Sequence, residues 1–478
     1  MFKPLKIWFQ LPFFLLHLAT CSTAHVSSKD LLRLTLDRYE VISRYVKKTL
    51  LLVSLGYGFA DAASITMRGV KYLEDFFNRF SRAAETGTDL SEFMHKEYET
   101  FMSYYVSDYD KRLIRLRRLS DLFLGLLSLI VFLMVTFIAS YMIWSELINY
   151  MYLIVPLSTT LLLSMAFSYY ISAPVEHIIA RSCKGYIKTL KQVSKALAVA
   201  LIISMLLTCI NTAYYITPGL DLIVLALSII SLIISLMTRK VIRRVRALEF
   251  EYPSFIKSFT YALSSIPSIR EAMRRISVLN FGKLTEVINE VNKRLSLGLN
   301  FETSFEPLFK TNSELIKIHT DVLLHCIRVG APPRKVGDLI VYSFTTHESL
   351  RRKKDEIVAY LRGSLIPIHV SFGVVVATLF SFMTLSKELV SMIEVPVLLE
   401  VPLLQPIPVS LFRLMFYMMY FMMCTVCSLI MYLLEDRNVM IFLYYLSILL
   451  IAGLVPYILL ELYLPDILKK ALIIPIPG

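Results

Sequence analysis

The apolar positions between residues 281 and 376 first follow the period of an amphipathic α-helix and then form an unbroken hydrophobic run. In the first part they lie on one face of a helix, with charged and polar residues on the other. These positions are Leu284, Val287, Ile288, Val291 and Leu295. Gly298 and Gly330 are predicted helix stops, because glycine readily adopts the left-handed conformation that ends a helix. A cationic run at 351–354 and an apolar segment from residue 363 follow. The pattern predicts a soluble helical bundle whose last helix continues into a membrane.

A shorter version of the same plan lies nearer the N-terminus. A predicted helix over 70–84 stops at Gly87, and Asp89 is placed to cap the next helix, with Glu92 three residues further on. Basic residues between 111 and 118 then precede an apolar run from Leu122. We therefore expect two soluble helical modules, residues 29–118 and 239–362.

Seven apolar runs are predicted membrane spans, of which the fourth is short for a bilayer of roughly 30 Å. The first four form a transmembrane block within residues 119–238, and about three more lie within residues 363–478. A further apolar stretch at 51–63 is broken by Gly56 and Gly58, so a span there is not favoured. The fold class is all-α, a polytopic helical membrane protein. The spans are Leu122–Met142, Met151–Ile171, Ala196–Ile216, Leu220–Met237, Ser364–Leu385, Val409–Leu434 and Val439–Tyr463.

Residues 1–28 form an N-terminal hydrophobic or interfacial segment. Lys3 and Lys6 precede a short apolar run, as in a signal peptide, and residues 18–21 approach a lipoprotein cleavage site. Thr20 before Cys21 fits that site poorly, and the run is too short to span a membrane. A membrane-surface or buried helix is therefore favoured over cleavage.

Composition agrees with a membrane protein: 56% of residues are hydrophobic and the formal net charge is +13. The six cysteines are scattered, so no disulfide framework is expected. Cys424 and Cys427 have CxxC spacing, but inside an apolar helix they are interpreted as buried small residues. His319 and His325 are interpreted as surface or core residues of the bundle. No metal ligand, cofactor or catalytic residue is predicted, because no phosphate-binding loop, dinucleotide fingerprint or hydrolase motif occurs.

Lysine and arginine in the loops set the expected orientation. The loops after the second and fourth spans are basic, whereas the Pro-rich loop 386–408 is mainly acidic. Both soluble modules are therefore expected in the cytoplasm and that loop outside. The span centres carry no Asp, Glu, Lys or Arg. This argues against a charge-coupled transporter but leaves a passive channel open.

The basic residues beside the membrane fall into two groups. One group abuts the fourth span, where topology and lipid headgroups explain it; it comprises Arg239, Lys240, Arg243, Arg244 and Arg246. The run at 351–354 lies about ten residues, or roughly 15 Å of helix, before residue 363. Lipid attraction fades over about 8 Å at physiological salt. We therefore predict a partner-docking site with a counterpart in the first module. Its residues are Arg351, Arg352, Lys353 and Lys354 with Lys111, Arg112 and Arg115. Nucleic acid is not expected, since no aromatic stacking platform accompanies these bases.

Three stretches, in this order, resemble the archaeal membrane platform proteins of type IV pilus and archaellum assembly, the type II secretion F family. They are Gly87–Glu99, Leu263–Met273, and Phe281–Phe309 followed by Ile327–Asp338. The sequence departs from the family after Gly330, where Ala-Pro-Pro replaces the usual turn, although Pro332 or Pro333 can still begin a helix.

The resemblance implies a non-enzymatic scaffold in the cell membrane. It implies a cytosolic hexameric secretion ATPase and pilin-like filament subunits as partners, and a homo-oligomer, with a dimer favoured. It leaves an archaellum and an adhesive or aggregation pilus as alternatives. A passive channel or transporter, or a receptor with cytosolic helical domains, stays open as a different class of function.

Overall fold

The computed structural model describes residues 2–36, 38–39, 41–67, 71–141, 148–174, 186–214, 220–392 and 409–472. All regular structure in these residues is helical, as the sequence predicts. The chain divides into two compact units. The polar unit comprises the described residues of Met1–Lys111 and Val241–Arg352, and the membrane unit comprises those of Arg112–Pro174, Lys184–Lys240 and Lys353–Gly478.

The unit boundaries fall inside three long helices, near the predicted boundaries at 118, 238 and 362. These helices are α6 (Leu90–Tyr141), α9 (Leu220–Ser265) and α15 (Pro333–Met392). Each combines an amphipathic part in the polar unit with an apolar part in the membrane unit. The N-terminal segment and the two soluble modules, which the sequence divides into three pieces, belong to one compact unit.

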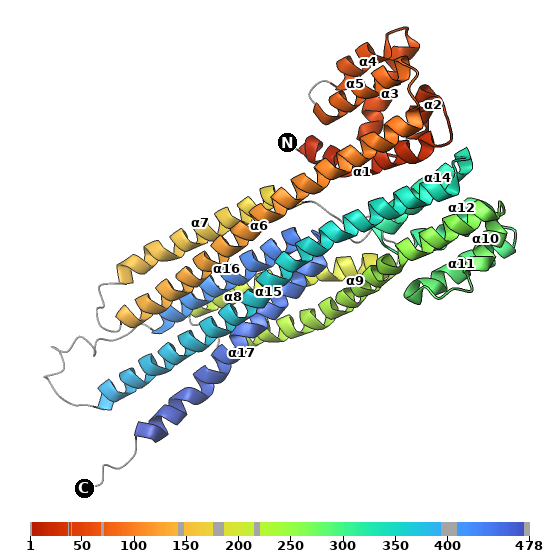
Figure 1. Cartoon of the computed structure of the whole chain (residues 1–478). Helices are drawn as coiled ribbons and strands as arrows, with labels where there is room; N and C mark the ends of the chain where they lie inside the picture. Colours follow the sequence, from red (N-terminus) through yellow and green to blue (C-terminus); the bar gives the residue numbers. More distant parts are fainter. Residues whose placement is uncertain are drawn as a thin grey trace. The chain divides into compact units, whose positions relative to one another are not determined.

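The polar unit is built from short helices around these long ones (Figure 1). Gly56, with φ of +96°, separates α3 from α4, so the apolar stretch at 51–63 is two short helices and no span. The remaining elements are α1 (Phe2–Ser22), α2 (Ser28–Leu34), α3 (Ile42–Ser54), α4 (Phe59–Met67), α5 (Lys71–Glu85), α10 (Ile269–Ile276), η2 (Gly282–Leu284), α11 (Thr285–Ser296), α12 (Phe301–Ser304), α13 (Glu306–Phe309) and α14 (Glu314–Val329).

The first helix, α1, is the shared core of both predicted modules. Phe14 makes an edge-to-face contact with Phe76 of α5, which belongs to the first module. Phe13 stacks on His347 of α15, which belongs to the second. Both phenylalanines are at most 2% exposed. Of the two interpretations of this segment, a buried helix therefore describes it, and a membrane-surface helix does not.

Four of the five positions of the predicted helix stripe in the second module are buried, and the fifth, Val287, is half-buried. Ile288, Val291 and Leu295 of α11 are buried, and Leu284 lies directly before them in η2. Apolar burial of this kind is the main force that holds short helices such as α10 to α13 in place.

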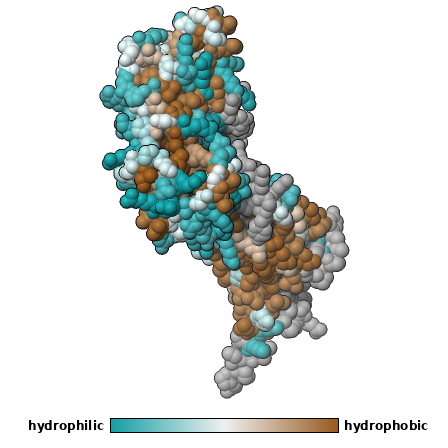
Figure 2. Space-filling model, turned by 90° about the vertical axis from the view of Figure 1, so that its right-hand side faces the viewer, coloured by the Kyte–Doolittle hydropathy of each residue, from teal (hydrophilic) through white to brown (hydrophobic). Residues whose placement is uncertain are grey.

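Among the described residues, seven helices are long and apolar enough to cross a membrane. Their apolar parts make up the membrane unit. The other four are α7 (Ile148–Ser172), α8 (Tyr186–Tyr214), α16 (Val409–Leu434) and α17 (Val439–Leu472), and they run side by side with α16 packed against α7, α8 and α17 (Figure 1). The apolar core of α16 is 72% buried, against 24–33% for α6 to α9, so α16 is central. The surface of this unit is mainly apolar, and that of the polar unit is mixed (Figure 2). The protein is thus a multi-pass membrane protein.

Cys424 and Cys427 are fully buried in α16, as their apolar setting predicts. The Pro-rich loop predicted on the outside lies mostly beyond the described residues.

Candidate docking site

The predicted docking run at 351–354 lies on α15, and its four bases point in two directions. A buried stripe along this helix includes Ile340, Phe344 and His347, continues through Arg351 and Lys354, and returns to apolar residues at Val358 and Leu361. Arg351 is 6% exposed and Lys354 only 1%. The stripe keeps its spacing of three or four residues throughout. Extending it from the apolar residues on either side would have identified these two bases as buried.

Arg351 is held by a carboxylate from another helix of the polar unit. Its Nη1 donates to Oε2 of Glu249 in α9 at 2.8 Å, and both side chains are less than 9% exposed. The Ser313 hydroxyl donates to the other carboxylate oxygen at 2.5 Å. Ser313 is also the N-cap of α14, because its hydroxyl accepts from the Ile316 amide at 3.1 Å. The pair therefore joins α9, α14 and α15.

Lys354 is held inside the membrane unit. Its Nζ donates to the Glu435 carbonyl oxygen at 3.4 Å, at the turn between α16 and α17. Arg351 and Lys354 thus have intramolecular partners and are not presented to a docking protein.

Arg352 and Lys353 are the two exposed bases of the run. Arg352 donates to Glu348 at 2.6 Å, one turn earlier on the same helix. Its guanidinium lies 5.9 Å from the ring centroid of Phe250 on α9. Of the four bases predicted to dock a partner in the second module, Arg352 and Lys353 therefore stay candidates for that contact.

In the first module, Lys111 and Arg115 of α6 are exposed and Arg112 is half-buried. Leu113 and Leu116, which lie between and beyond them, are buried. The counterpart of the docking run therefore keeps two fully accessible bases.

The five bases after the fourth span also differ in setting. Arg239 donates to Tyr445 at 2.8 Å and to Glu435 at 3.3 Å, and its guanidinium lies 4.2 Å from the ring centroid of Tyr444. It therefore connects α9 to α17 inside the membrane unit. Its partners are protein side chains, whereas the sequence interpretation assigned it to lipid headgroups. Lys240, Arg243 and Arg244 are exposed and Arg246 is half-buried.

The predicted helix stops have the backbone conformation that such positions require. Gly87, Gly298 and Gly330 have φ of +69°, +79° and +85°, and each lies just beyond a helix end. Asp89 accepts a hydrogen bond from the Ser91 amide at 2.9 Å, where α6 begins. After Gly330, α15 begins at Pro333. The Pro-Pro pair, where the sequence departs from the family's usual turn, therefore lies at the start of a helix.

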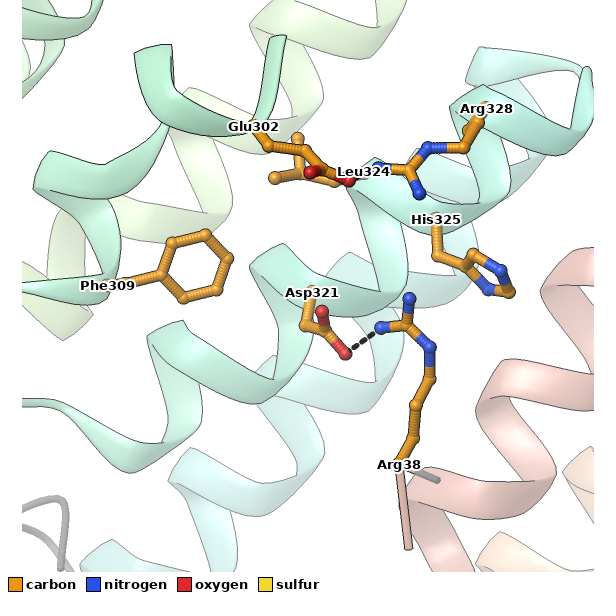
Figure 3. Close-up of a pocket in the computed structure, with 7 residues that line it drawn as sticks. All are labelled: Arg38, Glu302, Phe309, Asp321, Leu324, His325 and Arg328. Carbon is orange, nitrogen blue, oxygen red and sulfur yellow. Dashed lines mark hydrogen bonds and ion pairs between the residues drawn. The ribbon is translucent and has the colours of Figure 1, made fainter. Parts of the chain in front are cut away.

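A cavity of about 210 Å³ opens between α13 and α14 of the polar unit (Figure 3). Two ion pairs line it, one between Arg38 and Asp321 and the other between Arg328 and Glu302. Their charges balance, so the cavity has no evident preference for a charged ligand. Its wall includes His325, whose ring lies beside the Arg38–Asp321 pair (Figure 3).

Behind this wall lies a buried group of sulfur and nitrogen atoms that the sequence interpretation missed. His17 and Cys21 of α1 meet Cys326 of α14, with ligand atoms all within 4.8 Å of one another. His325 adjoins them, its Nδ1 2.6 Å from Nε2 of His17. Hydrogen bonds to Cys326 and to both histidines lower the pKa of the Cys21 thiol, although burial opposes this. The HxxxC spacing on α1 was a usable signal, but its partners lie some 300 residues later.

His319, the other histidine of α14, is a core residue, as one of its two interpretations has it. It is fully buried, its Nδ1 donates to the Leu315 carbonyl at 2.8 Å, and its Nε2 lies 3.0 Å from the Ser343 hydroxyl. Burial, together with the nearby His347, lowers the pKa of His319 to about 3. The ring is therefore neutral at physiological pH.

Comparison with known proteins finds a family model that matches the chain twice and a similar curated protein. The model of the family described as "Type II secretion system (T2SS), protein F" matches residues 14–143 and again residues 255–384, together more than half of the chain. "Flagella accessory protein J" of Methanocaldococcus jannaschii is 24% identical to the chain over 386 residues. That alignment covers 75% of this chain and 66% of the relative, just under two thirds of its length. No solved structure matches the chain.

Proposed function

The chain belongs to the type II secretion system protein F family, and we propose that it is the integral-membrane platform of a filament-assembly machine of the type IV pilus or archaellum kind. The observation that carries the proposal is the duplicated arrangement. Each family match begins in the polar unit and includes a long helix, α6 or α15, that carries an apolar span. The relative named as a flagella accessory protein supports the same class of machine.

In this proposal the protein is a scaffold with no catalysis of its own. A cytosolic hexameric secretion ATPase docks on the polar unit and on the adjoining turns of α6 and α15, and pilin-like subunits are drawn from the bilayer beside the membrane unit. Helices α6, α9 and α15 are continuous across the unit boundaries, so a force applied to their polar parts acts on the same helices that form spans. The platform works as a homo-oligomer, with a dimer as the favoured form.

The positive-inside pattern of the loops supports a cytoplasmic polar unit. A cytoplasmic location places Lys111, Arg115, Arg352 and Lys353 where a soluble ATPase can reach them. Exposed charges of this kind steer a partner of opposite charge and suppress wrong partners. Arg351 and Lys354 serve the fold instead, since both are buried and have intramolecular hydrogen-bond partners.

Charge reversal at the exposed positions tests the docking site. The double variant Arg352→Glu/Lys353→Glu is expected to insert normally and to bind the ATPase at least about tenfold more weakly, because like-charge contacts in an interface cost several kcal/mol. Binding of the purified ATPase to the detergent-solubilised platform measures this, and filament counts on cells show the consequence.

Lys283→Glu/Lys293→Glu is the matched control, since it reverses two exposed bases elsewhere in the polar unit. The control should bind the ATPase as the wild type does. Unchanged affinity in Arg352→Glu/Lys353→Glu, with normal filaments, would place the docking site elsewhere.

A further inference from the structure

Two pairs of metal-ligand side chains face each other across the contact between α1 and α14. His17 and Cys21 are four residues apart on α1 and so lie on one face of that helix. His325 and Cys326 are neighbours near the end of α14, and the two helices pack together in the polar unit. Sγ of Cys21 lies 3.2 Å from Sγ of Cys326 and 4.0 Å from Nδ1 of His325. The two imidazoles approach to 2.6 Å.

All four side chains of this cluster are buried. His17, Cys21 and Cys326 have no exposed surface, and His325 is 9% exposed. Two thiols and two imidazoles are the ligand set of structural zinc sites, in which zinc is held at about 2.3 Å from sulfur and about 2.0–2.1 Å from nitrogen. The thiolate ligands select zinc over magnesium or calcium, which bind to oxygen.

Charge balance favours the same ion. Two thiolates and a divalent cation sum to zero, so a buried metal–dithiolate group carries no net charge into the interior. An isolated buried ion, in contrast, is costly. His17 and His325 would bind as neutral imidazoles and leave this balance unchanged.

The surroundings contain polar groups that orient the ligands. The Tyr39 hydroxyl lies 3.3 Å from Nδ1 of His17 and donates to the Phe13 carbonyl at 2.8 Å. Thr20 Oγ1 lies 3.1 Å from Sγ of Cys326. Outer partners of this kind hold ligand rings and sulfurs in place in metal sites. His325 also lines the cavity in Figure 3, so one member of the cluster borders on that cavity.

A disulfide between Cys21 and Cys326 is the competing outcome. It requires the sulfurs to approach from 3.2 Å to about 2.05 Å, and it gives no reason for two buried histidines to converge on the same point. The complete set of four donors therefore fits a metal better than it fits a disulfide.

We propose that His17, Cys21, His325 and Cys326 bind one tetrahedral zinc ion, which fastens α1 to α14. The site joins the first helix of the chain to the second module, across 305 residues of sequence. Because Phe13 and Phe14 of the same helix contact both modules, zinc would set how the modules pack within the polar unit. This inference does not rest on the proposed function.

The test uses the full-length protein in detergent, purified anaerobically with reductant. The wild type is expected to hold about one zinc per chain by elemental mass spectrometry. After chelation, Co²⁺ should restore a tetrahedral spectrum with a thiolate-to-cobalt charge-transfer band. X-ray absorption at the zinc edge should show two sulfur and two nitrogen ligands. These measurements on the wild type decide the question even if ligand variants fail to fold.

Cys21→Ser and Cys326→Ser should each lose stoichiometric zinc. Cys424→Ser/Cys427→Ser is the matched control, because it removes two buried thiols from α16, and it should keep the zinc. The proposal is overturned by a wild type that binds no stoichiometric metal, by an oxygen-only ligand shell, or by zinc retained in the Cys21 and Cys326 variants. A quantitative Cys21–Cys326 disulfide in the anaerobic protein would overturn it as well.

Discussion

Replacing Arg351 by methionine removes one partner of the buried pair with Glu249 and leaves a carboxylate in the interior. Glu249 is 3% exposed, and without Arg351 it keeps the Ser313 hydroxyl as a donor and the nearby charge of Arg246. Removing one member of a buried ion pair typically costs about 3–5 kcal/mol, because the other charge loses its compensation. At roughly 2–4 °C per kcal/mol for a domain of this size, the unfolding midpoint should fall by roughly 6–20 °C.

Thermal unfolding in detergent, followed by circular dichroism, measures the change. Arg352→Met is the matched control: it alters the next residue of the same helix, where the side chain is exposed, and should shift the midpoint little. The double variant Glu249→Gln/Arg351→Met should recover much of the loss, because no buried charge is left and Ser313 still has an acceptor.

The reasoning is refuted if Arg351→Met unfolds at the same temperature as Arg352→Met. It is also refuted if the double variant is less stable than Arg351→Met alone. The result matters for docking, because a charge reversal that includes Arg351 or Lys354 would abolish filaments through misfolding and say nothing about the ATPase.

Three further predictions follow from other parts of the structure. Gly373→Ala on α15 should destabilise the protein by about 1–3 kcal/mol, since its Cβ would lie 2.3 Å from the Gly453 carbonyl oxygen of α17. Gly363→Ala is the control, because there is open space around Gly363, and it should not destabilise the protein. Equal thermal unfolding midpoints for the two variants would contradict this prediction. Lowering the pH from 7 to 5 should reduce the free energy of unfolding by up to about 2 kcal/mol through His319, because the unfolded ring protonates near its ordinary pKa of 6.5 while the folded one stays neutral down to about 3. With chelator present throughout, the unfolding midpoint of His319→Gln should lack this part of the pH dependence. A variant that keeps the wild-type pH dependence would disprove it. In intact cells, an impermeant thiol reagent should label a cysteine at Ser391 and spare one at Thr285, whereas the reverse labelling would invert the orientation and undermine the platform proposal.

The sequence by itself determined the helices and their ends. Hydropathy predicted the spans because a membrane helix needs about 20 consecutive apolar residues wherever it lies in the chain. The predicted span Val409–Leu434 has the same bounds as α16, and Met151–Ile171 lies within α7. By contrast, α8 begins ten residues before Ala196 and α17 ends nine residues after Tyr463. Gly87, Gly298 and Gly330 marked helix stops for an equally local reason, since only the backbone of that residue has to turn.

The tertiary structure decided which side chains meet. The apolar stripe of α15 indicates that Arg351 and Lys354 face inward, but only the packed helices determine that Glu249 and the Glu435 carbonyl are their partners. The tertiary structure also decided where the N-terminal segment lies. Its hydropathy suits a membrane surface as well as a core, but the contacts of Phe13 and Phe14 with both modules make it a core helix. His17 and Cys21 meet Cys326 for the same reason. Helix formation depends on neighbours three or four residues away, whereas burial and ligand geometry depend on residues brought together from distant parts of the chain.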